Sequence, residues 1–419
     1  MNQELSSFAA RLRELISSAS REDREDRKEK VPAPPLRSSR DILDLEFSAL
    51  ALELFALQFQ HNPAYRKICA ARNLTPETVK VWTQIPAVPT GAFKELELTS
   101  IPPAERTAVF HSSGTTEQKP SRHFHCAESL AVYEASLWPQ FCANALPDFK
   151  SGISNFKLAI LTPPPEQVPH SSLVHMFEVV RQKLGGGASV PALASPEQLC
   201  SCEGASRHEF FGKLADDGSW TLDFAATLAA LNPSPVTRHP SLVLGTAFSF
   251  VHLLDYLVER DLRVEVPPGS RVMETGGYKN RSRTLPKAEL HVLITERLGV
   301  PRENILCEYG MSELSSQAYD SVTSDAWQVA SGVTPVRHLS PVTRHFHFPP
   351  WARVQIISPE TGREVGEGET GLIRILDLAN VFSVAAIQTE DLGVRRGDGF
   401  ELIGRAQLAE PRGCSLMNA

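Results

Sequence analysis

Residues 304–317 read NILCEYGMSELSSQ, a short apolar run that is followed by a Tyr-Gly turn and a cluster of hydroxyl and carboxylate side chains. Apolar runs of this length, bounded by turn residues, are typical of buried strands. Similar runs lie upstream at residues 157–161, 241–244 and 271–273. Helical patterns lie between them, at residues 171–184 and 248–259. This alternation predicts an α/β body.

The segments on either side of this body differ in character. Apolar residues recur at helical spacing over residues 4–17 and again over 42–59, which predicts two helices. The mixed-charge stretch 21–30 indicates a solvated helix end or linker. After about residue 345 short strands alternate with glycine turns. We expect four parts: a helical region packing on the body (1–100), the α/β body (101–345), a β-rich closing segment (346–405) and a tail (406–419).

Composition limits the class of protein. The 419 residues include 42 basic and 49 acidic side chains, giving a net charge of −7, with 22% charged and 42% apolar residues. This balance is that of a soluble globular protein, and a net negative charge does not favour electrostatic binding of nucleic acid. No apolar run reaches the roughly 18 residues of a membrane span, and charged residues near the N-terminus argue against a secretory signal. We expect a cytoplasmic protein without a membrane span or a nucleic-acid partner.

The seven cysteines are scattered along the chain. The one close pair, Cys200 and Cys202, has no second pair or histidines nearby, so it indicates a zinc site only weakly. Most of the cysteines are expected to be small buried residues in a reducing compartment. Cys414 differs because it lies five residues from the end of the sequence, where burial is least expected.

A polar loop, HSSGTTEQKP at residues 111–120, predicts a phosphate-binding site. Gly114 can adopt backbone angles that turn successive N–H groups toward one point, and Lys119 adds positive charge. The hydroxyl donors are Ser112, Ser113, Thr115 and Thr116. Such a loop can bind a triphosphate, although it lacks the spacing of a Walker A loop. A polar surface turn is the alternative interpretation.

Two further segments carry groups suited to a nucleotide. In ETGGYKNRSR, residues 274–283, Gly276 and Gly277 follow a short strand and would permit close approach to a planar ligand. An ordinary strand-to-helix turn is the alternative there. Farther along, we expect Asp391 at a strand end, suited to accept hydrogen bonds from a ribose diol, with Arg405 within reach of ribose or phosphate.

The opening segment itself contributes three candidate groups. Tyr309 could stack on a base, while Ser312 and Glu313 offer oxygen ligands. Such oxygens suit Mg²⁺, which usually binds phosphates together with one or two protein groups. Each segment alone is unremarkable, and the order in which they occur along the chain is what makes them informative.

In this order the motifs resemble those of the adenylate-forming enzymes. The chain as a whole resembles more closely the acyl-protein synthetase (long-chain-fatty-acid–protein ligase) subunits of bacterial fatty-acid reductase complexes. The residues that carry the closer resemblance are SSGTT (112–116), PHSSLV (169–174), TGGYK (275–279), YGMSELSSQ (309–317), TEDLG (389–393) and RGCSL (412–416). The implied fold is the large domain of the adenylate-forming enzymes, and the implied cofactors are ATP and Mg²⁺.

The resemblance also implies a role for each position. The ATP phosphates would be held by Ser113, Gly114, Thr115, Thr116 and Lys119. The adenine pocket would contain Gly276, Gly277, Tyr309 and its neighbour Gly310. The remaining roles would be α-phosphate contact by Ser312, Mg²⁺ ligation by Glu313, ribose binding by Asp391 with Arg405, and acyl acceptance by Cys414.

The sequence departs from the family pattern in three places. Glu117 replaces the last glycine of the usual loop, and Tyr278 stands where tryptophan is more usual. Only 14 residues follow Arg405, none of them lysine, so the mobile lid of about a hundred residues and its lysine are expected to be absent. The nine residues from Arg405 to Cys414 span at most about 30 Å, which is enough to bring a tethered thiol back to the site.

The predicted function is therefore ATP-dependent activation of a fatty (carboxylic) acid to acyl-AMP, followed by transfer to Cys414 and delivery to a reductase subunit. The acyl pocket is expected around residues 245–254 and 173–180, with His170 as either a gate or a structural histidine. Two alternatives stay open. One is a coenzyme A ligase of the phenylacetate type, and the other is a non-catalytic nucleotide-binding scaffold.

Overall fold

The computed structural model describes residues 2–26, 37–112, 119–146, 156–185, 208–232, 239–276, 285–322 and 344–405. The predicted N-terminal helices are present and longer than their apolar patterns, as α1 (Gln3–Asp26) and α2 (Arg37–His61). Leu5, Phe8 and Leu12 of α1 are buried. Because α1 continues to Asp26, the first part of the mixed-charge stretch is a helix end. Two short helices follow, α3 (Pro63–Ala70) and α4 (Ala92–Glu95).

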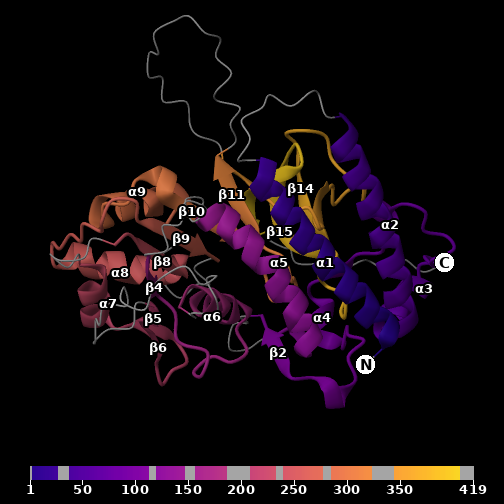
Figure 1. The fold of residues 1–419 in the computed structure, drawn as a ribbon, viewed down its shortest axis with the longest axis horizontal. Coiled ribbons are helices and arrows are strands. Elements are labelled where there is room, and N and C mark those ends of the chain that lie inside the picture. Colours follow the sequence, from indigo (N-terminus) through magenta and orange to yellow (C-terminus); the bar gives the residue numbers. More distant parts are fainter. Residues whose placement is uncertain are drawn as a thin grey trace, which may run out of the picture.

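A sheet of twelve strands forms the centre of the molecule (Figure 1). Its order is β13-β14-β15-β16-β12-β11-β10-β9-β8-β4-β5, with β1 beside β15. The strands on the α/β side are β4 (Lys157–Ile160), β5 (His208–Phe210), β8 (Ser241–Thr246), β9 (Arg271–Thr275) and β10 (Ile305–Tyr309). They are mutually parallel. Four of them, β4, β8, β9 and β10, confirm strands that the sequence predicted.

The β-rich end of the chain continues the same sheet in antiparallel fashion. Its strands are β11 (Ala318–Val322), β12 (Arg344–His347), β13 (Ala352–Ile357), β14 (Thr370–Asp377), β15 (Ala386–Arg396) and β16 (Gly399–Arg405), and β1 (Val88–Pro89) joins the edge of β15. Two hairpins stand apart from the sheet, β2 (Ala108–His111) with β3 (Arg122–His125), and β6 (Gly212–Leu214) with β7 (Trp220–Leu222).

Helices cover both faces of the parallel strands, which confirms the α/β class. On one face lie α5 (Ala127–Ala145) and α6 (Ser172–Gly185), and on the other lie α7 (Phe224–Leu231), α8 (Ala247–Glu259) and α9 (Lys287–Leu298). Alternation along each strand decides which face a side chain meets. Leu244 and Met273 pack in the cluster that includes α5 and α6, whereas their neighbours Val243 and Val272 pack against α8 and α9.

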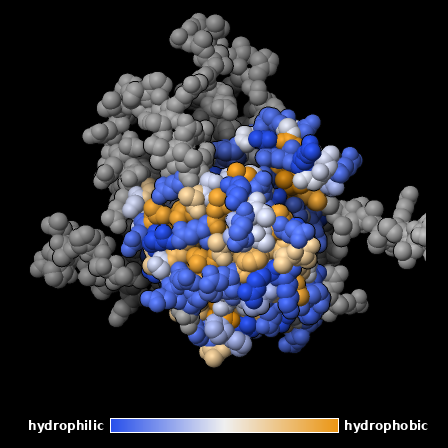
Figure 2. All heavy atoms as spheres, turned by 90° about the vertical axis from the view of Figure 1, so that its right-hand side faces the viewer, coloured by the Kyte–Doolittle hydropathy of each residue, from blue (hydrophilic) through white to orange (hydrophobic). Residues whose placement is uncertain are grey.

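The N-terminal helices pack against the β-rich end of the chain through a third apolar cluster. Polar contacts join the same parts. The Gln58 side chain of α2 donates to the carbonyl of Asn380 at 2.8 Å and accepts from the N–H of Ala385 at 3.0 Å. Figure 2 shows the face on the right of Figure 1, where hydrophilic residues surround small apolar areas. Among the described helices, none is both long and apolar enough to cross a bilayer.

Candidate active site

The predicted phosphate loop is the tip of the β2–β3 hairpin. Ser113, Gly114, Thr115 and Thr116 lie outside the described residues, but both ends of the loop are placed. The Ser112 hydroxyl accepts a hydrogen bond from the Ser121 N–H at 3.0 Å, which closes the base of the loop. Lys119 is half exposed, and its ammonium lies 3.3 Å from the Glu95 carboxylate on α4.

A tight turn after β10 carries Ser312 and Glu313. Both side chains are buried, at 6% and 4% exposure. The Glu313 carboxylate accepts hydrogen bonds from the hydroxyl of Ser312 at 3.0 Å and from that of Ser121 at 2.5 Å. Because Ser121 lies just before β3, the hairpin that bears the loop contacts the turn directly. The structure thus brings Ser312 and Glu313 to the base of the predicted phosphate loop.

A second residue of the hairpin, His123, strengthens this contact. Its Nδ1 lies 2.8 Å from the carbonyl oxygen of Ser312. Burial lowers the pKa of His123 to about 4, although the bond to Ser312 opposes the shift. The ring is therefore neutral near pH 7, and Nδ1 carries the proton, because a carbonyl oxygen can only accept.

Two residues, one at the end of β14 and one just after it, hold the far side of the turn that carries Ser312 and Glu313. The Asp377 carboxylate is fully buried and accepts from the N–H groups of Ser315, Ser316 and Ala379 and from the Ser316 hydroxyl, at 2.7–3.0 Å. Asn380 donates to the Glu313 carbonyl at 2.9 Å. The turn is thus fixed between the hairpin and the β-rich part of the sheet.

The structure brings Tyr309, Asp391 and Arg405 together. The Tyr309 hydroxyl donates to Asp391 at 2.9 Å, and the Arg405 guanidinium lies 3.6 Å from the same carboxylate. The Tyr309 ring packs edge-on against Phe346, Phe348 and Phe400, with centroids 5.2–6.3 Å apart. Burial raises the pKa of Asp391, and the Tyr309 hydroxyl and Arg405 oppose the rise.

One expectation about Asp391 is wrong. It does not lie at a strand end but in the interior of β15, paired in register with Arg405, the last residue of β16. The strand continues past it because β15 pairs with β14 as far as Thr370, and a register shift at Gly393 accommodates the bend. The strand that ends at this position is the neighbouring β16, whose last residue is Arg405.

The two glycine positions differ in their surroundings. Gly276 follows β9 with a φ of 69°, which favours glycine, and the space that a Cβ would occupy is open. Gly277 lies outside the described residues. At Gly310 a Cβ would meet the Glu308 carboxylate, so a larger residue there would displace that side chain.

Other predicted residues lie apart from this centre or cannot be assigned. Cys414 is outside the described residues. His170 is exposed. Its ring lies at a tilt of 33° to that of His111, with centroids 4.6 Å apart, and its Nδ1 lies 3.1 Å from the Val109 carbonyl oxygen. Phe250 and Leu253, which the pocket prediction included, are fully buried in the α8 core cluster.

Sequence reasoning missed Ser121, His123, Asp377 and Asn380. The first two lie in SRHFHC (121–126), where histidines alternate with other residues as expected of a strand with one buried face. The other two lie in DLANVFS (377–383), where a carboxylate and an amide interrupt an apolar run. Buried polar groups require partners, so both patterns were available signals, but neither identified the partner.

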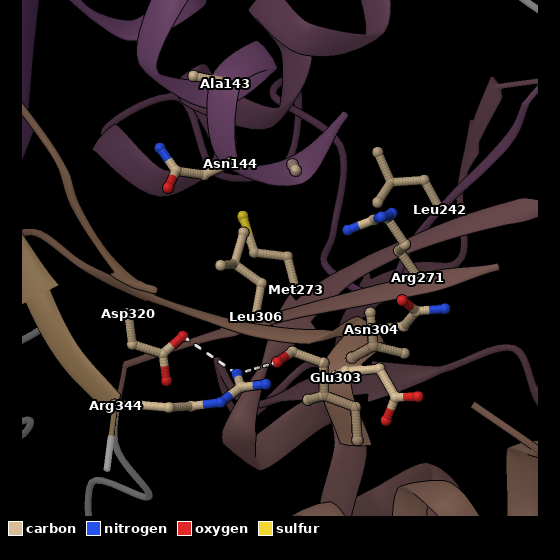
Figure 3. A pocket seen from close by; sticks show the side chains of 13 residues that line it. Ala143, Asn144, Leu242, Arg271, Met273, Glu303, Asn304, Leu306, Asp320 and Arg344 are labelled. Atoms are coloured by element: carbon tan, nitrogen blue, oxygen red, sulfur yellow. Dashed lines mark hydrogen bonds and ion pairs between the residues drawn. The ribbon is translucent and has the colours of Figure 1, made fainter. Parts of the chain in front are cut away.

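A cavity of about 200 Å³ lies at the opposite end of the parallel strands, near the amino ends of β8, β9 and β10. Figure 3 shows Met273 and Leu306 among the side chains that line it and Arg344 directed toward Asp320, with 3.5 Å between guanidinium and carboxylate. In open parallel sheets ligands bind beyond the carboxyl ends of the strands. The cavity is therefore distinct from the Ser312–Glu313 centre.

A family model described as acyl-protein synthetase, LuxE, matches residues 205–419, just over half of the sequence. The chain belongs to this family. As an acyl-protein synthetase it is a ligase. Two relatives are the long-chain-fatty-acid–luciferin-component ligases of Aliivibrio fischeri and Vibrio harveyi. They are 21% and 20% identical to this LuxE-family chain over 382 and 378 residues, which cover 88% of it in both cases and 87% and 86% of the relatives.

Solved structures show the same fold. A 2-hydroxyisobutyryl-CoA ligase in its thioesterification state, bound to its acyl-AMP and coenzyme A, has a TM-score of 0.58 at 14% identity over 90% of this chain and 73% of that one. An open conformation of the ligase gives a TM-score of 0.56 at 13% identity, covering 90% and 80%. This LuxE-family chain therefore has the fold of the adenylate-forming ligases.

Proposed function

We propose that this chain uses ATP and Mg²⁺ to activate a fatty (carboxylic) acid as acyl-AMP, transfers the acyl group to its own Cys414 and delivers it to a reductase partner in the cytoplasm. The observation that carries the proposal is the hydrogen bond between Ser121 and Glu313. It joins the predicted phosphate hairpin to the predicted metal and α-phosphate residues. The fatty acid is supported by the names of the two relatives, which are long-chain-fatty-acid ligases.

In the first step, an oxygen of the acid attacks the α-phosphorus of ATP, and the bond to the β-phosphate breaks to release pyrophosphate. Two anions must meet, so positive charge and hydrogen-bond donors have to face the phosphates. Lys119 and the loop hydroxyls would bind the outer phosphates, and Ser312 would contact the α-phosphate. When bound, Mg²⁺ would neutralise phosphate charge.

The residues present fit this ion. Glu313 offers carboxylate oxygens, which Mg²⁺ prefers. Each of its two oxygens accepts a hydrogen bond from one serine hydroxyl and has a second lone pair that can bind the ion. Among the described residues, no three His, Cys, Asp or Glu side chains form a group able to hold a metal. Glu313 would therefore share the ion with phosphate oxygens of the nucleotide.

In the second step, the Cys414 thiolate attacks the acyl carbon, the bond to AMP breaks and a thioester forms. A free thiol is only a few per cent ionised near pH 7, and the adjacent Arg412 would favour the thiolate. A tethered nucleophile has a high effective concentration. The position of Arg405 beside Asp391 supports this step, because the tail starts there and can extend about 30 Å.

The test is acyl labelling of the purified protein with radiolabelled tetradecanoate, ATP and Mg²⁺. We expect a hydroxylamine-labile band in the wild type that Cys414→Ser abolishes. Cys142→Ser, which changes a half-buried cysteine of α5, should leave the band intact. A band that persists in Cys414→Ser would refute the assignment of this cysteine. Pyrophosphate release without labelling, with acyl-CoA formed on adding coenzyme A, would instead favour a soluble-thiol ligase.

A further inference from the structure

A row of polar side chains crosses the sheet beside the proposed reaction centre. Thr275, Glu308 and Tyr319 are paired in register on β9, β10 and β11. Residues that face each other on neighbouring strands lie on the same side of a sheet. Tyr319 packs in the cluster that contains α5 and α6, so the whole row lies on that face. Glu274, one residue before Thr275, faces the other way and contacts His291 of α9 at 3.3 Å.

The row marks a sharp change in polarity along this face. Two residues closer to the amino ends of the strands, the row on the same face consists of Leu244, Met273 and Leu306, all of which belong to the apolar cluster. The polar row lies at the carboxyl ends of the strands, where parallel sheets bind ligands. Glu308 is only two residues before Gly310 and its carboxylate lies against that glycine. The row therefore lies at the end of β10 that leads into the turn with Ser312 and Glu313.

Several polar atoms around the row have no hydrogen-bond partner within the part of the chain that the structure describes. The Tyr319 hydroxyl and the Gln317 Oε1 are buried and have no hydrogen-bond partner among the described residues, although their residues are only 1% and 4% exposed. Gln317 also lies close to Gly310, on the side where the Glu308 carboxylate sits. On α6, the buried His175 Nε2 lacks a partner in the described structure, and its ring lies 5.5 Å from that of Tyr133.

Glu308 itself is a buried carboxylate with few partners. It is 5% exposed and accepts a hydrogen bond from the Thr275 hydroxyl. Burial raises its pKa to about 7, Thr275 opposes the rise and the nearby Glu274 adds to it. Tyr319 lies opposite Glu308 on the neighbouring strand, and after burial the charge of Glu308 is the next cause that raises the pKa of Tyr319. Buried polar groups that lack enough hydrogen-bond partners are destabilising.

We propose that Glu308, with Thr275, Tyr319 and Gln317, binds a hydrogen-bond-donating substituent, hydroxyl or ammonium, on the acid that the enzyme activates. The inference rests on the proposed function and narrows its substrate to substituted acids. The carboxylate of Glu308, the amide oxygen of Gln317 and the phenol oxygen of Tyr319 can accept hydrogen bonds from such a group. An unsubstituted alkyl chain would leave these groups without a partner at the carboxyl end of the sheet. Sites built to hydrogen-bond a substrate discriminate against analogues that lack the polar group, so tetradecanoate would be a slow substrate that still labels the protein.

The experiment is acid-dependent ATP–pyrophosphate exchange by the full chain. The acids are butanoate and tetradecanoate, each compared with its 2- and 3-hydroxy and its 2- and 3-amino derivatives. We expect one substituted acid to exceed the unsubstituted acid of the same length by at least about 100-fold in kcat/KM. An unsubstituted acid that equals or exceeds all its derivatives would overturn the inference and leave the proposed function standing. No exchange with any acid would overturn the proposed function, and this inference with it.

Variants at Glu308 separate recognition from folding. Glu308→Leu should lose most of the preference for the substituted acid while it still exchanges with the unsubstituted one. Glu308→Gln should lower kcat/KM for the hydroxy acid by no more than about tenfold and should lower it further for the amino acid. Only the ammonium group needs the negative charge of the carboxylate. The matched control is Asp320→Asn, at a buried carboxylate that lines the cavity at the amino ends of the strands, and it should leave the ratio between the acids unchanged. An unchanged ratio in a folded Glu308→Leu variant, with melting monitored by circular dichroism, would refute the role of Glu308.

Discussion

The hydroxyl of Ser121 donates a hydrogen bond to the carboxylate of Glu313, 192 positions later in the sequence, and both side chains are buried. The bond connects the base of the predicted phosphate loop with the predicted metal ligand. A hydrogen bond to a charged group contributes about 1.5–3 kcal/mol. The position of the Glu313 carboxylate therefore depends on a residue of the hairpin.

Replacing Ser121 by alanine should impair catalysis more than folding. We expect Ser121→Ala to reduce acid-dependent ATP–pyrophosphate exchange by about 10- to 100-fold, with a higher Mg²⁺ concentration at half-maximal rate, because Glu313 is no longer oriented. The measurement is exchange as a function of Mg²⁺ concentration. As a control, Ser249→Ala removes another buried serine hydroxyl, at the start of α8, and should leave the Mg²⁺ dependence unchanged. Identical Mg²⁺ curves for Ser121→Ala and wild type would contradict the proposed coupling.

The buried His123 should make stability depend on pH. Its pKa is lowered to about 4 by burial, whereas an unfolded histidine titrates near about 6.5. Between these values the unfolded chain binds a proton that the folded chain does not, so the free energy of unfolding falls as the pH falls through this window. For this residue alone the loss between pH 7.5 and pH 5 is about 2 kcal/mol.

The contribution of His123 can be isolated by comparison with His123→Asn. Urea unfolding at pH 7.5 and pH 5 should show a smaller loss of stability on acidification in the variant than in the wild type. Histidines that do not contact His123, including His252, whose pKa burial also lowers, contribute equally to both proteins. If both proteins lose the same free energy between the two pH values, His123 is not the buried neutral group described above.

Asp377 should be critical for stability. Its carboxylate accepts four hydrogen bonds and is fully buried. Asp377→Ala would leave three backbone N–H groups and a hydroxyl unpaired, and we expect a loss of about 3–5 kcal/mol in the free energy of unfolding. Urea denaturation measures this. As a control, Asp216→Ala, at an exposed aspartate, should change the free energy of unfolding by less than about 0.5 kcal/mol. An equally small change for Asp377→Ala would show that the hydrogen bonds of Asp377 do not stabilise the turn.

The sequence predicted four of the five parallel strands, because local periodicity reports burial directly. It did not predict β11, whose residues Ala318–Val322 include Asp320. That carboxylate is buried because Lys287 and Arg344, from distant parts of the chain, pair with it at 2.8 Å and 3.5 Å. Partners of this kind lie outside any local window of sequence.

The site shows the same division between local and distant information. Motif order indicated that Arg405 lies beside Asp391, and the two side chains are 3.6 Å apart. The contact between Ser121 and Glu313 depends on how a separate hairpin docks on the sheet, which local pattern does not encode. Asp391 was misplaced at a strand end because the glycines around it resemble a turn, whereas pairing on both sides extends β15 past it.

The bonds from Gln58 to Asn380 and Ala385 have a consequence for how the chain acquires its structure during synthesis. The partners are more than 320 residues apart, and translation proceeds at about 5–20 residues per second. The first helices leave the ribosome roughly 15–60 s before the strands that cover their apolar side. Over that interval a nascent chain of this protein presents α2 without its partner, so chaperone binding is expected to concentrate on its first third.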